Sequence, residues 1–110
     1  MSADSVQIEP GDLIPVEYGN GHTIAAKALS GRGKRKLMQL LEELQEVQES
    51  KANIGKVFDL AEQAFLLCVP DATDEQIEKM DEKQQLEIAG KVLASTVLTD
   101  EQRKKLESLH

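Results

Sequence analysis

The spacing of leucines after residue 33 constrains this chain more than any other feature. Large apolar side chains recur there at intervals of three and four residues, at Leu37, Leu40, Leu41, Leu44 and Val47. Glutamates occupy the positions between them. Because one turn of an α-helix takes 3.6 residues, this spacing predicts an amphipathic helix with one face turned to a core. Ser30 or the glycines beside it would begin this helix, and Ser50 lies near its end.

A second amphipathic stretch follows and carries both phenylalanines. Its apolar side chains share one predicted helix face, which holds Ile54, Val57, Phe58, Ala61, Ala64, Phe65 and Cys68. Pro70 lacks a backbone donor and restricts the residue before it, so the helix must end ahead of it. We expect this helix to form the centre of the core, with Cys68 as a small buried hydrophobe.

Three short segments predict the starts of later helices. Residues 73–76 (TDEQ) form a capping box, in which Thr73 and Gln76 satisfy each other's backbone N–H groups. Residues 81–84 (DEKQ) begin a helix that we expect to continue through Val97, with apolar side chains at Leu86, Ile88, Ala89, Val92 and Leu93. Residues 99–102 repeat the capping box and predict a final helix that bears Leu106 and Leu109.

Residues 14–29 predict a β-hairpin. Asn20 and Gly21 are typical of a type I′ turn, because both tolerate a positive φ. Before the hairpin, residues 1–12 are expected to be a flexible acidic arm, in which the alternation of Val6 and Ile8 allows a short edge strand. The expected fold class is α+β, mainly α. It has one domain over residues 13–110, with the hairpin in 13–29 and four to five helices in 30–110.

The net charge of −7 is unevenly distributed. Four cations lie within five residues, and we call them the basic cluster: Arg32, Lys34, Arg35 and Lys36. Cations at a helix N-terminus oppose the helix dipole, so helix stability does not explain them. Three interpretations stay open: a solvated surface, contact with an acidic partner or second subunit, and contact with nucleic-acid phosphates.

Residues that carry chemistry give an enzyme little support. Besides Cys68 there are two histidines, His22 in the predicted turn and His110 at the last position. The glycines near the basic cluster lack the spacing and the hydroxyl of a phosphate-binding loop. We expect no catalytic residue, no cofactor and no metal. We also expect a cytoplasmic location, because a single cysteine suits a reducing compartment and no apolar run approaches a membrane span.

The first and fourth predicted helices carry broad apolar faces. Either these faces pack between two neighbours in one core, or part of them stays exposed for self-association or for a partner's amphipathic helix. Gly90 would permit close approach of another helix. The candidate partner-binding residues are Arg32, Lys34, Arg35, Lys36, Met38, Leu41, Ile88 and Val92.

The order of these elements resembles that of a known family. The hairpin segment IPVEYGNGHTIAAKALSG is followed by RGKRKLMQLLEEL, VFDLAEQAFLLCV, PDATDEQIEKM and LEIAGKVLAST. Over residues 14–98 this order is similar to that of the small tail assembly chaperones of long-tailed bacteriophages, in which a short β element precedes a mostly helical body. The family pattern D-x-T-x-E-x-[IV] is matched by Asp71, Thr73, Glu75 and Ile77.

The resemblance implies a non-enzymatic protein in the host cytoplasm. Such a protein binds the tape-measure protein and keeps it soluble before the tail tube polymerises around it, with the tail-tube protein as a second candidate partner. The family pattern does not require the basic cluster. The alternative function is therefore a small nucleic-acid-associated regulatory protein that uses the basic cluster, which the overall acidity disfavours.

Overall fold

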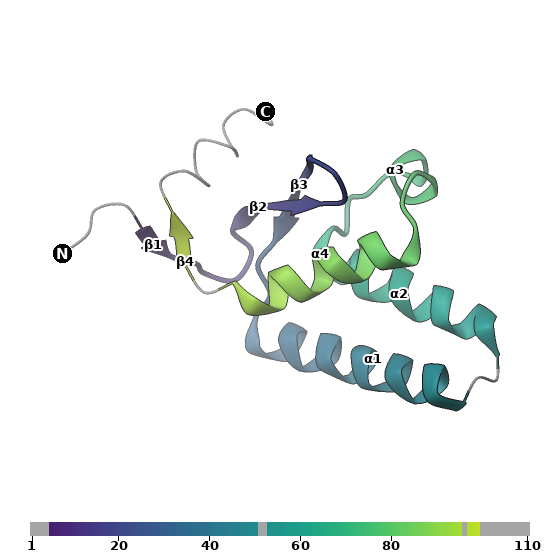
Figure 1. Cartoon of the computed structure of the whole chain (residues 1–110). Coiled ribbons are helices and arrows are strands. Elements are labelled where there is room, and N and C mark those ends of the chain that lie inside the picture. The colour runs from purple at the N-terminus through teal and green to yellow at the C-terminus, as the bar shows by residue number, and fades with distance from the viewer. Residues whose placement is uncertain (1–4, 51–52, 96, 100–110) are drawn as a thin grey trace.

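The computed structural model describes residues 5–50, 53–95 and 97–99, which form four helices and two small sheets (Figure 1). The elements in chain order are β1 (Ser5–Gln7), β2 (Leu13–Tyr18), β3 (His22–Lys27), α1 (Gly31–Ser50), α2 (Ile54–Cys68), α3 (Asp74–Glu78), α4 (Glu82–Ala94) and β4 (Val97–Thr99). A mainly helical chain with an N-terminal hairpin confirms the coarse fold prediction. The predicted final helix with Leu106 and Leu109 lies outside the described residues.

The hairpin pairs β2 with β3 in antiparallel register, from Leu13 opposite Lys27 to Tyr18 opposite His22. Its turn therefore has three residues, with a positive φ at Gly19 (59°) and Gly21 (85°) but not at Asn20. The predicted type I′ turn is wrong, because the two flanking glycines supply the left-handed backbone in place of an Asn-Gly pair.

A second small sheet joins the two ends of the described chain. β1 pairs antiparallel with β4, so the segment predicted as a flexible arm contains the edge strand that its alternation allowed. The prediction that the last long helix continues through Val97 is wrong. This helix ends at Ala94, Ser95 has an extended backbone (φ −75°, ψ 125°), and Val97–Thr99 pair with β1. Strand pairing with a distant segment thus overrides the helical spacing.

The predicted caps position three of the helices. Gly33 N–H donates to Ser30 Oγ (3.1 Å) at the start of α1. The predicted capping box at residues 73–76 is confirmed, because Gln76 N–H donates to Thr73 Oγ1 (3.2 Å) and the reciprocal bond is present. A second complete box lies at Asp81, where only a helix start was predicted, and there Gln84 N–H donates to Asp81 Oδ1 (2.8 Å). Residues 100–102 of the other predicted box lie outside the described residues. These side chains fix where α1, α3 and α4 begin.

The core lies where the hairpin, α1 and α4 meet around α2. Its largest fully buried side chains are Phe65, Ile14, Leu37, Ile88, Val92 and Cys68. α2 ends at Cys68, ahead of Pro70, as predicted. The prediction that one whole face of α2 is core is wrong at its start, where Ile54 and Phe58 are exposed. This end of α2 extends past α4, so α4 does not cover it (Figure 1).

The arrangement of the helices leaves one face open. α1 and α4 each pack along α2, whereas they scarcely contact each other. None of the four described helices is long and apolar enough to cross a bilayer.

Candidate protein-binding surface

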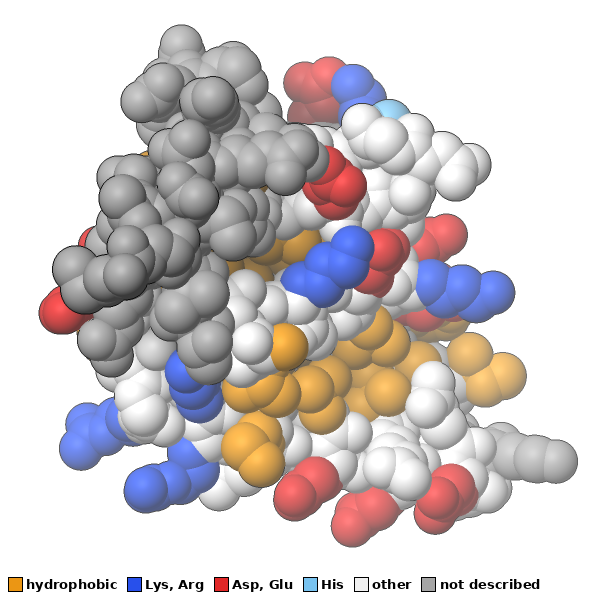
Figure 2. All heavy atoms as spheres, turned by 60° about the vertical axis from the view of Figure 1, so that its left-hand side comes forward, with side chains coloured by type: hydrophobic (Ala, Val, Ile, Leu, Met, Phe, Trp, Pro, Cys, Tyr) orange, Lys and Arg blue, Asp and Glu red, His pale blue; other side chains and the backbone are white. Residues whose placement is uncertain are grey.

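An apolar surface lies along the gap between α1 and α4. Figure 2 shows hydrophobic side chains gathered there, above the acidic side chains at the lower edge of α1. Within the described residues, the large hydrophobic side chains with the most exposed surface are Ile54 (68%), Met38 (51%) and Phe58 (49%). We define the apolar strip as six side chains from three helices: Met38, Leu41, Val57, Phe58, Leu86 and Leu93.

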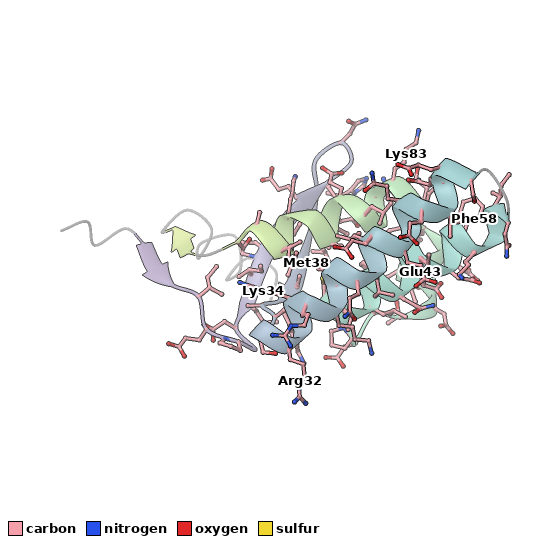
Figure 3. The ribbon with its side chains drawn as sticks, turned by 90° about the horizontal axis from the view of Figure 1, so that it is seen from below. Arg32, Lys34, Met38, Glu43, Phe58 and Lys83 are labelled. Atoms are coloured by element: carbon pink, nitrogen blue, oxygen red, sulfur yellow. The ribbon has the colours of Figure 1, made fainter. Side chains whose placement is uncertain are left out.

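The phase of α1 explains why its part of the strip is uncovered. Leu37 and Leu44 lie seven residues apart and are buried, so they set the inner face of the helix. Met38 lies on the adjacent flank, on the side nearest α4 (Figure 3). Leu41 follows three residues later and therefore shares this flank. Because α4 lies too far away to cover this flank, Met38 stays half exposed and Leu41 is only partly buried.

One flank of α4 contributes to the strip, and the inner face of α4 contributes to the core. Leu86 and Leu93, seven residues apart, are partly buried and lie on one side of the helix. Ile88 and Val92 are fully buried against α2 and the hairpin. The predicted partner-binding role of these two residues is therefore wrong, because they are core residues with no surface to offer.

The basic cluster begins α1 but does not form one face. Arg32, Arg35 and Lys36 are exposed, Lys34 is half buried, and none of the four forms an ion pair with a described residue. Successive residues turn by 100° around a helix. Arg32 accordingly points away from the body, while Lys34 lies on the side of Met38 (Figure 3). Only part of the cluster borders the apolar strip.

The other end of α1 is acidic. Glu42, Glu46 and Glu49 are exposed along its outer side, and Glu43 forms an ion pair with Lys56 (3.0 Å). α1 therefore carries positive charge at its first turns and negative charge over its second half. The charge beside the apolar strip therefore changes from positive to negative along α1.

A polar pocket of about 500 Å³ lies on the other side of α1, against the start of α2. Its lining includes Glu43, Lys56 and Asp59, and the first two neutralise each other through their ion pair. Across the parts of the chain that the structure describes, no three side chains of His, Cys, Asp or Glu are placed to hold a metal ion.

Cys68 and His22 lie in different surroundings. Burial raises the pKa of the Cys68 thiol to about 12, so the thiol stays protonated at neutral pH. His22 was predicted to lie in the turn but is the exposed first residue of β3, opposite Tyr18, and the two rings stack with their centres 5.4 Å apart. The expectation that Cys68 packs as a buried hydrophobe is confirmed.

The strip combines nominated and other residues. Met38 and Leu41 lie on it, and their partner-binding role stays a prediction. Val57 and Phe58 were predicted as core residues, whereas the apolar face of the fourth helix, with Leu86 and Leu93, was left open between core and exposed surface. Their helical spacing carries no signal of exposure, because exposure depends on where a neighbouring helix stops. No protein-family model, curated protein sequence or solved structure matches the chain.

Proposed function

We propose that this chain is a non-enzymatic tail assembly chaperone that binds the tape-measure protein and keeps it soluble before tail-tube polymerisation. The observation that carries the proposal is the apolar strip, in which Met38 on α1 and Phe58 on α2 are about half exposed (Figure 3). The order of elements that resembles this chaperone family adds support. The tail-tube protein is a second candidate partner, and the host cytoplasm is the expected location.

The proposed mechanism is physical masking. A long helical protein exposes apolar stripes until the tail tube encloses it, and such stripes aggregate in water. Burial of Met38 and Phe58 against a stripe stabilises the complex by roughly 1 kcal/mol for each side chain. The charged side chains around the strip stay in water and keep the complex soluble.

Co-expression tests the proposal. The tape-measure protein from the same phage genome is produced alone, with this chain, and with the double variant Met38→Glu/Phe58→Glu. We expect the native chain to raise the soluble yield of the tape measure and to co-purify with it, and the double variant to do neither. Equal soluble yields in the three cultures would overturn the proposal. Circular dichroism checks that the variant is folded, which the exposure of both positions predicts.

One observation favours the alternative, a nucleic-acid-associated regulatory protein. The basic cluster has three exposed cations, and none of its four cations is neutralised by a described carboxylate. This alternative predicts binding of DNA or RNA that weakens steeply with salt and is lost when all four cations become alanine. A flat titration at low salt would exclude it.

A further inference from the structure

The shape of the apolar strip fits one kind of occupant. α1 and α4 lie apart on α2, and the strip extends between them from Met38 on α1 toward Phe58 on α2. An amphipathic α-helix presents a single apolar stripe along its length, and it satisfies its own backbone hydrogen bonds. A helix that lay along the strip would contact Met38, Leu41 and Phe58 and add a fourth helix to the three already packed together.

Gly90 leaves room for this occupant on α4. It is exposed between Leu86 and Leu93, and a Cβ atom built there would meet no atom of this chain within 4 Å. Glycine in a helix interior costs stability relative to alanine. Its presence here, beside the strip, allows the backbone of another helix to come close.

The charges of α1 give the occupant a direction. Lys34 and Arg35 border the strip at one end, and Glu42 and Glu49 lie along its edge toward the other end. The C-terminal end of a helix carries partial negative charge and the N-terminal end partial positive charge. Both charges are complementary to α1 only if the occupant runs antiparallel to it.

We infer that the apolar strip binds an amphipathic α-helix antiparallel to α1, with acidic residues in its C-terminal half beside Lys34 and Arg35 and basic residues in its N-terminal half beside Glu42 and Glu49. The identity of this helix as a tape-measure segment rests on the proposed function. The apolar stripe and the charge pattern expected of this helix are inferred only from the strip and from the charged residues of α1 beside it.

Two synthetic peptides of about 20 residues, the length of α1, test the inference. Both carry leucine at every third or fourth position. The first peptide has lysines in its N-terminal half and glutamates in its C-terminal half, and the second has the two charge types exchanged. Fluorescence anisotropy with the full chain measures each Kd. We expect the first peptide to bind about 10-fold more tightly than the second. Equal affinities, or no binding of either peptide, would overturn the inference.

Variants of the chain locate the binding. In Glu42→Lys/Glu49→Lys the preference for the first peptide should disappear. Gly90→Gln should weaken binding of the first peptide about 10-fold, because its side chain would lie where the helix approaches. The matched control is Gly55→Gln on α2, an exposed helical glycine that lines the polar pocket and is not one of the strip residues, and this variant should bind as the native chain does. Unchanged binding by Gly90→Gln, or an equal loss in both variants, would contradict the assigned surface.

The same variants separate this inference from the proposed function. If Gly90→Gln co-purifies with the tape-measure protein as well as the native chain does, the chaperone function stands and the strip is not its binding surface. If the first peptide binds with the expected preference while the tape measure does not co-purify, the strip binds a helix from another protein and the chaperone function fails.

Discussion

At the scale of single residues, Gly19 and Gly90 respond in opposite ways to an added side chain. Gly90 lies within α4 and has open space beside it, so Gly90→Ala should raise the free energy of unfolding by about 0.5–1 kcal/mol. Gly19 has a φ of 59°, and a Cβ there would lie 2.8 Å from Gln84 Nε2, within the capping box of α4. Gly19→Ala should therefore destabilise the fold. Urea titrations of the two variants check the predicted signs.

The buried thiol of Cys68 supplies a second prediction for one residue. Because the burial that raises its pKa to about 12 also hides it from reagents, the folded chain should react with iodoacetamide only by unfolding. We expect the alkylation rate to rise with urea in parallel with the unfolded fraction measured by circular dichroism. Rapid alkylation in native buffer would show that Cys68 is accessible and that the core around Phe65 is not closed.

The role of a side chain was predictable from the sequence where that role depends on residues close to it in the chain. Ser30, Thr73 and Asp81 cap helices as their sequence neighbours indicate, because each bonds to a backbone group three residues away. Met38 and Val92 are both apolar residues at helical spacing, yet one is on the surface and the other is in the core. Their difference depends on the packing of α1 and α4 on α2, which no local pattern encodes.

At the scale of whole elements, the two complete capping boxes should differ in their effect on stability. α4 contributes Ile88, Ala89 and Val92 to the core, whereas α3 has no fully buried residue. Asp81→Ala should lower the global free energy of unfolding by about 1 kcal/mol. Thr73→Ala should mainly speed amide hydrogen exchange within α3 and leave global unfolding nearly unchanged. Equal global effects would mean that α3 is as integral to the fold as α4.

The contact between α4 and the hairpin turn should make stability depend on acid pH. Gly19 N–H donates to Glu87 Oε1 (3.1 Å), and Lys91 pairs with the same carboxylate (3.1 Å). These contacts hold the Glu87 pKa below its ordinary value. The hydrogen bond from Gly19 N–H has the larger effect and Lys91 the smaller one. Because the pKa is lower in the folded chain, the stabilisation is complete above the ordinary glutamate pKa and is lost as pH falls through the folded value.

Glu87→Gln tests this dependence. The variant should be less stable than the native chain near neutral pH, and the difference should shrink as pH falls from about 7 to about 3. Thermal unfolding at several pH values measures both trends. Glu78→Gln is the matched control, since Glu78 is exposed on α3 with no hydrogen bond or ion pair to a described residue, and it should unfold like the native chain throughout. A pH-independent difference between Glu87→Gln and the native chain would contradict the assignment.

Elements defined by local spacing were predictable, and the element defined by distant pairing was not. The hairpin, α1, α2, α3 and α4 follow the predicted order, with boundaries shifted by a few residues. β4 was predicted as helix, because residues 97–99 continue the apolar spacing of α4. Their extended conformation results from pairing with Ser5–Gln7, some ninety residues earlier in the chain, which a reading of neighbouring residues does not detect.

At the scale of the whole molecule, the open face between α1 and α4 joins the fold to the proposed function. α1 and α4 both pack on α2 and scarcely contact each other. The apolar flanks of α1 and α4 therefore have no partner helix within the described residues (Figure 2). Exposed glutamates over the second half of α1, and Lys34 at its start, lie beside this face, and Lys34 forms no ion pair with a described residue. The central proposal is that the tape-measure protein binds at the apolar strip.

The oxidation rate of Met38 reports whether the bound tape-measure protein covers the strip. Hydrogen peroxide converts an exposed methionine to its sulfoxide, and mass spectrometry measures the rate at each position. In the purified complex with the tape-measure protein, oxidation of Met38 should slow several-fold relative to the free chain. Oxidation of the partly buried Met80, which lies beyond α3 and outside the strip, should keep its rate. A complex in which Met38 oxidises as fast as in the free chain would contradict the claim.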